Sequence, residues 1–206
     1  MQNVSSSNSE KALVPKLRFP EFTDEYKRVK LKNIANKVVR NNPNSDAPIM
    51  MISAASGFID QSTKYSRENA GKSLRKYTLL KQGELAYNHG ASKLRTFGCC
   101  FELEKEEARI PYVYHTFSVN EEQCTHYIAK YLNNSLIDKQ LKKLVTSSVR
   151  MDGLLNISYD EYMSINLNIP NYNEQSKIAA FLSLIDIKIK LQQQLIENLK
   201  LYKKGY

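Results

Sequence analysis

The sequence lacks the motifs on which most enzyme classes depend. It has neither a GxGxxG nor a GxxxxGK[ST] pattern, so both glycine-rich loops that hold phosphate groups are absent. It has no GxSxG pattern, and its three histidines are too scattered to suggest a Ser/His/Asp set. No proline is followed directly by aspartate, so the common nuclease pattern that begins Pro-Asp is missing. We therefore expect a protein that is not an enzyme by itself.

One stretch comes close to a catalytic motif. Asn168-Ile169-Pro170-Asn171-Tyr172 resembles the Asn-Pro-Pro-Tyr type of loop against which adenine methyltransferases place a flipped base. The spacing differs, however, and no glycine-rich loop for a cofactor precedes it. We interpret the stretch as the end of a strand before a helix, and we expect the chain to bind no cofactor.

Cysteine is scarce, with three in the chain. Cys99 and Cys100 are neighbours, so their side chains point to opposite faces if FGCCFEL is a strand, which makes a shared metal site awkward. A ligand set can be drawn from Cys99, Cys124 and His126, but no CxxC pair supports it. We expect reduced thiols in the core and no metal.

Long apolar runs are missing too. No run approaches the roughly 20 residues that a membrane span requires, because Asp186, Lys188 and Lys190 interrupt the longest candidate. The opening stretch MQNVSSSNSEKAL has no apolar core like that of a secretion signal. We expect residues 1–14 to form a disordered arm, and we expect a cytoplasmic location with no membrane partner.

Positive charge, by contrast, is in excess. The 206 residues include 30 Lys and Arg against 21 Asp and Glu, which gives a net charge of +9. Such an excess favours a polyanionic partner, since each neutralised phosphate also releases a condensed counterion. Most of the basic side chains that attract attention lie in predicted loops.

These loop residues form a candidate DNA-binding set. Arg and Lys can donate to guanine O6 and N7, and Asn can bond adenine twice. The set comprises Lys64, Arg67, Lys72, Arg75, Lys76, Asn88, Lys93, Arg95 and Arg150. Lys142 and Lys143 lie on a predicted helix and are better suited to phosphates or to solvent. For any single member, an ordinary solvated side chain is the alternative.

Residues 15–170 are expected to form one β-rich domain. DEYKRVKLKNIANKVV predicts a short strand that runs into a helix around Leu31 to Val39. Residues that favour strands are concentrated in IMMIS, KYTLL, GELAYN, FGCCFEL, VYHTFSV and SINLNIP. From Glu121 to about Val145 apolar residues return at helical spacing, and YDEYM fits a helical turn. The expected fold class is α+β, a mixed domain with a β-rich core followed by a long helix.

The last segment, residues 171–206, predicts that helix. Asn171 and Glu174 have the spacing of a capping box, with Asn173 as the alternative cap. Two adjacent apolar stripes follow, so the apolar face is wide enough to meet more than one neighbour. We expect partner contacts through Ile178, Phe181, Leu182, Ile185, Ile189, Leu195, Ile196 and Leu199. At 1.5 Å per residue the helix exceeds the size of the body, so part of it should project. The alternative is a helix that lies back on its own domain.

Four stretches together resemble the specificity subunits of type I restriction-modification systems. They are VPKLRFPEF with the basic strand after it, KYTLLKQGELAYN through FGCCFEL, SSVRMDGLLNISYDEYMSINLNIP, and NEQSKIAAFLSLIDIKIKLQQQLIENLKLYKKGY. The last stretch is similar to that family's "EQ-x-x-I-A" spacer helix, with Glu174, Gln175, Ile178 and Ala179 as the match.

The resemblance implies a non-catalytic subunit. Residues 15–170 would be a target recognition domain that reads one half of a split site in double-stranded DNA through the major groove. Residues 171–206 would be a spacer helix that pairs as an antiparallel coiled coil and docks DNA adenine methyltransferase subunits. Those subunits carry S-adenosylmethionine and methylate adenine, and a separate restriction subunit cuts DNA.

The sequence departs from that family in length. The usual subunit has two recognition domains and two spacer helices, whereas this chain has one of each. We therefore expect a half subunit that forms a homodimer or pairs with another half subunit, and two identical halves would need identical, inverted half-sites. Two other hypotheses remain open: a helical adaptor that binds only protein, and a nuclease or methyltransferase with an unusual motif.

Overall fold

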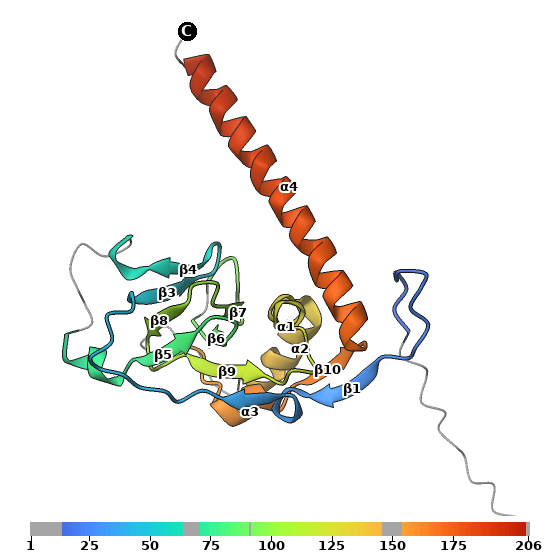
Figure 1. The fold of residues 1–206 in the computed structure, drawn as a ribbon, viewed down its shortest axis with the longest axis horizontal. Helices are drawn as coiled ribbons and strands as arrows, with labels where there is room; N and C mark the ends of the chain where they lie inside the picture. Colours follow the sequence, from blue (N-terminus) through green and yellow to red (C-terminus); the bar gives the residue numbers. More distant parts are fainter. Residues whose placement is uncertain (1–13, 64–70, 91, 146–153, 205–206) are drawn as a thin grey trace, which may run out of the picture.

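The computed structural model describes residues 14–63, 71–90, 92–145 and 154–204 (Figure 1). Nearly all of the predicted arm therefore lies outside the described residues. A four-stranded antiparallel sheet forms the centre, in the order β2 (Ala35–Lys37), β9 (His115–Val119), β6 (Leu85–Asn88) and β7 (Cys99–Glu102). Three further pairings are β1 (Lys27–Lys30) with β10 (Asn166–Ile169), β3 (Met50–Ser53) with β4 (Gly57–Asp60), and β5 (Thr78–Lys81) with β8 (Glu107–Ile110). The predicted α+β class with a β-rich core is confirmed.

Strand β6 separates two hydrophobic cores. Leu85 and Tyr87 lie in a core with helices α1 (Thr125–Tyr131), α2 (Ser135–Leu144) and α3 (Tyr159–Met163), whereas Ala86 lies in a second core with β3, β5 and β8. Strand β7 alternates in the same way, because Cys100 faces the first core and Cys99 the second. Both thiols are buried and reduced, as predicted. Burial raises the pKa of Cys99 to about 11, so its thiol is neutral near pH 7.

The prediction of a helix around Leu31 to Val39 is wrong. A short 3-10 turn, η1 (Leu31–Asn33), leads directly into strand β2, whose Ala35 and Lys37 stand opposite Val119 and Phe117 of β9. The burial of Leu31, Ile34, Ala35 and Val38 has helical spacing by coincidence. Pairing with β9 satisfies the backbone groups of the segment, and this long-range contact outweighs local preference.

The helical period between Glu121 and Val145 belongs to two helices and not to one. The first ends at Tyr131, and Asn134 caps the second, since its Oδ1 accepts from Leu136 N and Ile137 N at 2.7 and 3.0 Å. Its neighbour Asn133 is held by strand β7, because Asn133 Nδ2 donates to Cys100 O at 2.6 Å and Cys100 N donates to Asn133 Oδ1 at 3.0 Å. Asparagine competes with the helix backbone for such bonds, which explains the break.

The sequence did not predict strands β4 and β8. Strand β8 carries Glu107 and Arg109 on its outer side, and Arg109 Nε donates to Ala47 O at 3.0 Å. Strand β4 begins at Gly57, whose φ of +70° is the left-handed conformation that favours glycine. A turn over residues 54–56 precedes Gly57, and the pairing of Met51 with Ile59 makes the following segment a strand.

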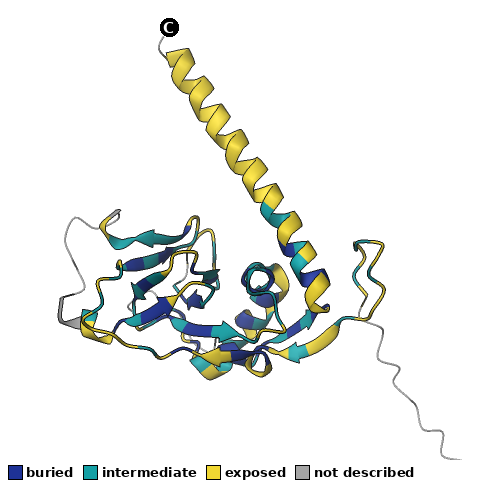
Figure 2. Ribbon diagram, viewed as in Figure 1, coloured by how far each residue is buried: buried dark blue, intermediate teal, exposed yellow. Residues whose placement is uncertain are grey.

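Helix α4 (Tyr172–Lys204) leaves the body at a steep angle (Figure 1). Its 33 residues span about 50 Å at 1.5 Å per residue. The first turns are buried against the body and the remainder is exposed (Figure 2). The alternative of a helix lying back on its own domain is therefore wrong. Among the described residues, no helix is long and apolar enough to cross a membrane.

Candidate nucleic-acid interface and projecting helix

The base of α4 is fixed by a buried carboxylate. Glu174 is fully buried and accepts two bonds from Arg18, from Nε at 2.8 Å and from Nη2 at 2.6 Å. Tyr26 Oη donates to Glu174 Oε1 at 3.1 Å. Burial, together with the Glu174 carboxylate, raises the pKa of Tyr26 to about 12, so that hydroxyl stays protonated. The predicted cap is confirmed, because Glu174 N donates to Asn171 Oδ1 at 3.0 Å.

The neighbouring residues of the matched motif complete this anchor. Gln175 is buried; its Oε1 accepts from Cys124 N at 3.0 Å, and its Nε2 donates to Pro170 O and Gln123 Oε1 at 2.9 Å each. Ala179 is buried in the first core, where a larger side chain would not fit without rearrangement. The side chains of Glu174, Gln175 and Ala179 thus fix the direction in which α4 leaves the domain.

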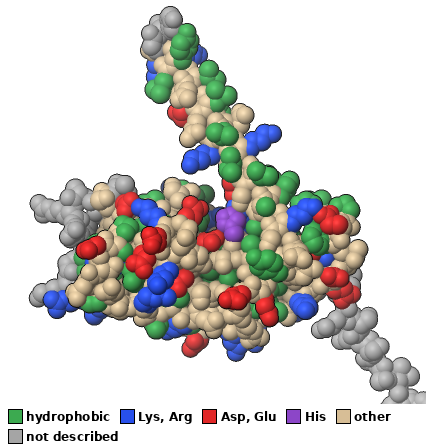
Figure 3. All heavy atoms as spheres, in the orientation of Figure 1, with side chains coloured by type: hydrophobic (Ala, Val, Ile, Leu, Met, Phe, Trp, Pro, Cys, Tyr) green, Lys and Arg blue, Asp and Glu red, His purple; other side chains and the backbone are tan. Residues whose placement is uncertain are grey.

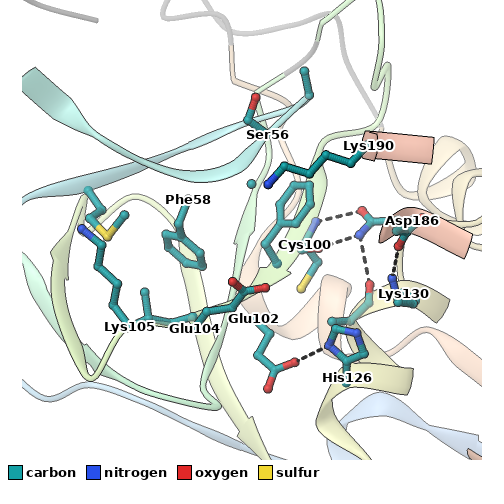
Figure 4. A pocket seen from close by; sticks show the side chains of 17 residues that line it. Ser56, Phe58, Cys100, Glu102, Glu104, Lys105, His126, Lys130, Asp186 and Lys190 are labelled. Carbon is teal, nitrogen blue, oxygen red and sulfur yellow. Dashed lines mark hydrogen bonds and ion pairs between the residues drawn. The ribbon is translucent and has the colours of Figure 1, made fainter. Parts of the chain in front are cut away.

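A hollow of about 600 Å³ lies where α4 passes α1, β7 and the β3–β4 hairpin (Figure 4). Figure 3 shows acidic and basic side chains on its walls. His126 of α1 connects β7 with α4, since its Nδ1 is 3.0 Å from Glu102 Oε2 and its Nε2 is 2.8 Å from Ser183 Oγ. Lys130 and Asp186 form a further ion pair between α1 and α4.

The Ser183–His126–Glu102 chain has the order of a catalytic triad but not its chemistry. Ser183 Oγ donates to Ala179 O at 2.8 Å, within its own helix. The bond to a carbonyl four residues earlier is the ordinary contact of a serine with its own helix, and it accounts for the position of Ser183 Oγ without a catalytic role. In the described part of the chain, no group of three or more His, Cys, Asp or Glu side chains could hold a metal ion.

Beyond these contacts, α4 exposes apolar side chains along its length (Figure 3). Of the predicted contact residues, Ile178 and Leu182 are partly buried against the body, and Phe181, although half exposed, packs edge-on against Phe19 with ring centres 5.7 Å apart. The others are exposed: Ile185, Ile189, Leu195, Ile196 and Leu199. Ile187 and Leu201 are exposed as well, although the sequence analysis did not select them. Apolar side chains therefore emerge on more than one face of α4.

The predicted DNA-binding residues are only partly brought together. Lys64, Arg67 and Arg150 lie outside the described residues, and Lys72 is described only as part of the 3-10 helix η3 (Gly71–Lys76). Arg75 and Lys76 are exposed at the end of η3, where Asn41 Nδ2 donates to Arg75 O at 2.7 Å. This end of η3 thus brings two of the predicted residues together.

Two members of the predicted set also hold the fold. Asn88 donates from Nδ2 to Ile52 O at 3.3 Å, and its Oδ1 accepts from Gly90 N at 2.9 Å. Arg95 Nη1 donates to Asn133 O at 2.7 Å, at the break between α1 and α2. Lys93, in the same loop as Arg95, is exposed. Bonds to backbone carbonyls use donors that base edges would need, so Lys93 is the stronger candidate in this loop.

The sequence analysis missed several basic residues near the N-terminal strands. Exposed cations lie along β1 and β2 and just after β1; they are Lys27, Arg28, Lys30, Lys32 and Lys37. The signal was present in the alternation of KRVKLK, in which Val29 and Leu31 face inward. The candidate set was limited to cations in predicted loops, so these strand residues were left out.

No protein-family model matches this chain, and no curated protein matches its sequence. Among solved structures, its fold is similar to that of the HsdS subunit from Thermoanaerobacter tengcongensis. The TM-score is 0.55 at 11% sequence identity, and the match covers 82% of this chain and 44% of that chain. The fold expected from the resemblance is confirmed by this similarity.

A second solved chain has the same likeness. It comes from a structural study of complex assembly and conformational transition of the type I R-M system. Its TM-score is 0.56 at 12% identity, with 90% of this chain and 47% of that chain covered. The matched part of this chain therefore covers less than half of either solved chain.

Proposed function

We propose that this chain is the DNA-recognition component of a type I restriction-modification complex. One observation carries the proposal: a basic, β-rich domain with an HsdS-like fold anchors a helix that projects away from it with exposed leucine and isoleucine side chains. Residues 15–170 bind one part of a split duplex site in the major groove. Residues 171–206 set the distance to the next recognition domain and dock adenine methyltransferase subunits.

Pairing of α4 follows from its exposed surface. Ile189 and Leu195 are each about half exposed, and apolar surface of this extent on a helix is stabilised when a second helix covers it. Two copies of the chain pair antiparallel through α4, which places a recognition domain at each end. A two-fold assembly of identical chains then binds identical, inverted half-sites. The methyltransferase subunits supply S-adenosylmethionine and the chemistry, and a restriction subunit joins through them.

The direct experiment is to map methylated adenines in cells with and without this chain. We expect a split motif with two inverted, identical halves that loses its methylation when the chain is deleted. An unchanged set of methylated adenines would contradict the proposal. A wild-type allele returned on a plasmid is the control, because it should restore methylation at the same motif.

The projecting helix also suits an adaptor that binds only protein. A gel shift with this chain, an adenine methyltransferase subunit and a mixture of duplexes separates the two functions. The recognition component shifts DNA in the presence of the methyltransferase, whereas an adaptor joins the protein complex and leaves every duplex unshifted.

A further inference from the structure

Two hollows beside helix α3 are lined by cations and contain no carboxylate. The first, of about 280 Å³, lies beside β2 and η3 and includes Tyr159, the first residue of α3. The second, of about 490 Å³, lies beside β1, α2 and β10 and includes Ser164, just after α3 ends. We call them the β2 hollow and the β1 hollow. Neither has an Asp or Glu among its described lining residues. By contrast, Glu102, Glu104 and Asp186 line the larger hollow of about 600 Å³ described above, which we call the hollow at the base of α4.

In the β2 hollow, two lysines lie over aromatic rings. Lys37 Nζ lies 4.6 Å from the ring centre of Tyr159, and Lys76 Nζ lies 5.8 Å from that of Tyr112. A cation over an aromatic ring is positioned without being neutralised. Arg40 differs, because Glu84 binds its two terminal nitrogens at 3.0 and 2.9 Å.

In the β1 hollow, the two cations are Arg28 and Lys143. Neither forms an ion pair with any residue that the structure describes, and both are exposed. Lys143 lies in the last turn of α2, where the helix dipole alone favours a cation, but Arg28 lies on a strand and has no such local reason. Gln140 fixes the wall, since its amide donates to Asn166 O at 2.8 Å and accepts from Asn166 N at 2.9 Å.

We propose that these four cations, Arg28, Lys37, Lys76 and Lys143, hold the sugar–phosphate backbone of duplex DNA on the two sides of α3. This inference rests on the proposed function and identifies the face that the duplex meets. Phosphate contacts come from Lys, Arg, amide and hydroxyl groups, and they position a duplex without reading its sequence. Both hollows offer this chemistry, and their described lining contains no carboxylate, although Asp160 is exposed on α3 between them.

The polar lining favours DNA over an acidic protein. Protein–protein interfaces have an apolar centre, whereas protein–DNA interfaces are more polar and much more positively charged. In the β1 hollow the described lining is mostly amide, hydroxyl and cationic, with Leu144 and Ile165 as the apolar members. The neighbouring Asn168 stands opposite Arg28 in the pairing of β1 with β10, so an amide lies next to the guanidinium.

The salt dependence of duplex binding tests this assignment. The full chain is titrated onto a labelled mixed-sequence duplex of about 30 bp, at several salt concentrations between roughly 50 and 200 mM. Two double variants, Lys37→Gln/Lys76→Gln and Arg28→Gln/Lys143→Gln, each remove two charges. Lys105→Gln/Lys190→Gln is the matched control, because it removes two charges from the hollow at the base of α4.

Each double variant should bind the duplex roughly tenfold more weakly, and the slope of log K against log salt should fall by about 0.9 per lost phosphate contact. The control should keep the wild-type slope, and Lys37→Arg/Lys76→Arg should restore it. Equal losses in the control, or unchanged slopes in both double variants, would overturn the assignment. All four side chains are exposed, so thermal melting should confirm that every variant is folded.

The outcomes separate this inference from the proposed function. If the wild-type chain binds no duplex even at the lowest salt concentration and with an adenine methyltransferase subunit added, the proposed function fails and the face assignment fails with it. If the wild type binds and only the assignment is wrong, the variants lose no more than the control. Loss of an acidic protein partner without any loss of duplex binding would also overturn the assignment.

Discussion

Arg18 and Glu174 are 156 positions apart in the sequence and form a two-bond ion pair at the point where α4 leaves the domain. Arg18 comes from the segment before β1, and Glu174 from the first turn of the helix. The contact therefore joins the two ends of the domain across the pairing of β1 with β10. The direction of the projecting helix depends on the segment before β1 as much as on the helix itself.

A double-mutant cycle should show this coupling. Arg18→Met leaves a fully buried carboxylate without its main partner, and Glu174→Gln removes the charge that Arg18 binds, so each should lower the urea midpoint. In the combined variant the loss should be smaller than the sum, by more than the roughly 0.5 kcal/mol within which independent sites add. Lys105→Met with Asp60→Asn is the control, an exposed pair whose removal should change little. Simple additivity at Arg18 and Glu174 would mean that the pair does not act as a unit.

His115 should make the stability of the domain depend on pH. Burial lowers the pKa of His115 to about 4, helped by neighbouring His89 and Lys37, although the bond from its Nε2 to Ile157 O acts in the opposite direction. The unfolded chain, with an ordinary histidine pKa near 6.5, binds the proton first, so stability falls as pH drops from about 6.5 towards 4. Between about pH 7.5 and pH 5 the His115 contribution should fall by on the order of 2 kcal/mol.

The variant His115→Gln isolates that contribution. An amide can still donate to Ile157 O, but it does not titrate, so the variant should lose less stability on acidification than the wild type. Urea unfolding of both proteins at the two pH values measures the difference, and carboxylates that titrate in the same range cancel. Parallel losses in the two proteins would show that His115 does not carry the effect.

Lys93 and Arg95 lie in the same loop but should have different roles, Lys93 in DNA binding and Arg95 in stability. Lys93→Ala should leave the melting temperature unchanged, and if Lys93 contacts a base it should weaken binding to the specific duplex by about 1–3 kcal/mol. Arg95→Ala should instead cost about 1 kcal/mol of stability, because it removes the bond to Asn133 O. Binding to specific and mixed duplexes should be compared for both variants. Equal losses on every duplex would assign Lys93 to phosphate.

These two residues illustrate how far the sequence predicts the site. Lys93 and Arg95 look alike in the sequence, as cations in one polar loop, but only the structure reveals that Asn133 accepts from one of them. Asn88 was selected for its amide, and that amide is occupied by Ile52 O and Gly90 N. A sequence gives the donors that a loop carries, whereas the acceptors that use them come from segments far along the chain.

The fold was more predictable where the signal was local. Alternation marked β6 and β7 well enough to place Cys99 and Cys100 on opposite faces, and the spacing of Asn171 and Glu174 marked the start of α4. The segment from Leu31 to Val39 was assigned wrongly because its outcome depends on β9, more than 70 residues further along. The burial of Glu174 could not be predicted either, because its partners Arg18 and Tyr26 are equally remote.

The exposed part of α4 should control assembly and leave the domain intact. Ile185→Asp with Ile189→Asp introduces two charges where a partner helix would need apolar contacts, so self-association or methyltransferase docking should be lost. The thermal melt of the body should not change, because neither side chain is buried in it. Gln193→Asp with Asn198→Asp is a matched control that adds the same charge at polar positions of the helix. Sedimentation at micromolar concentration, alone and with a methyltransferase subunit, measures both associations. A wild-type chain that sediments as a monomer and binds no methyltransferase would contradict the docking role of α4, as would an Asp variant that assembles like the control.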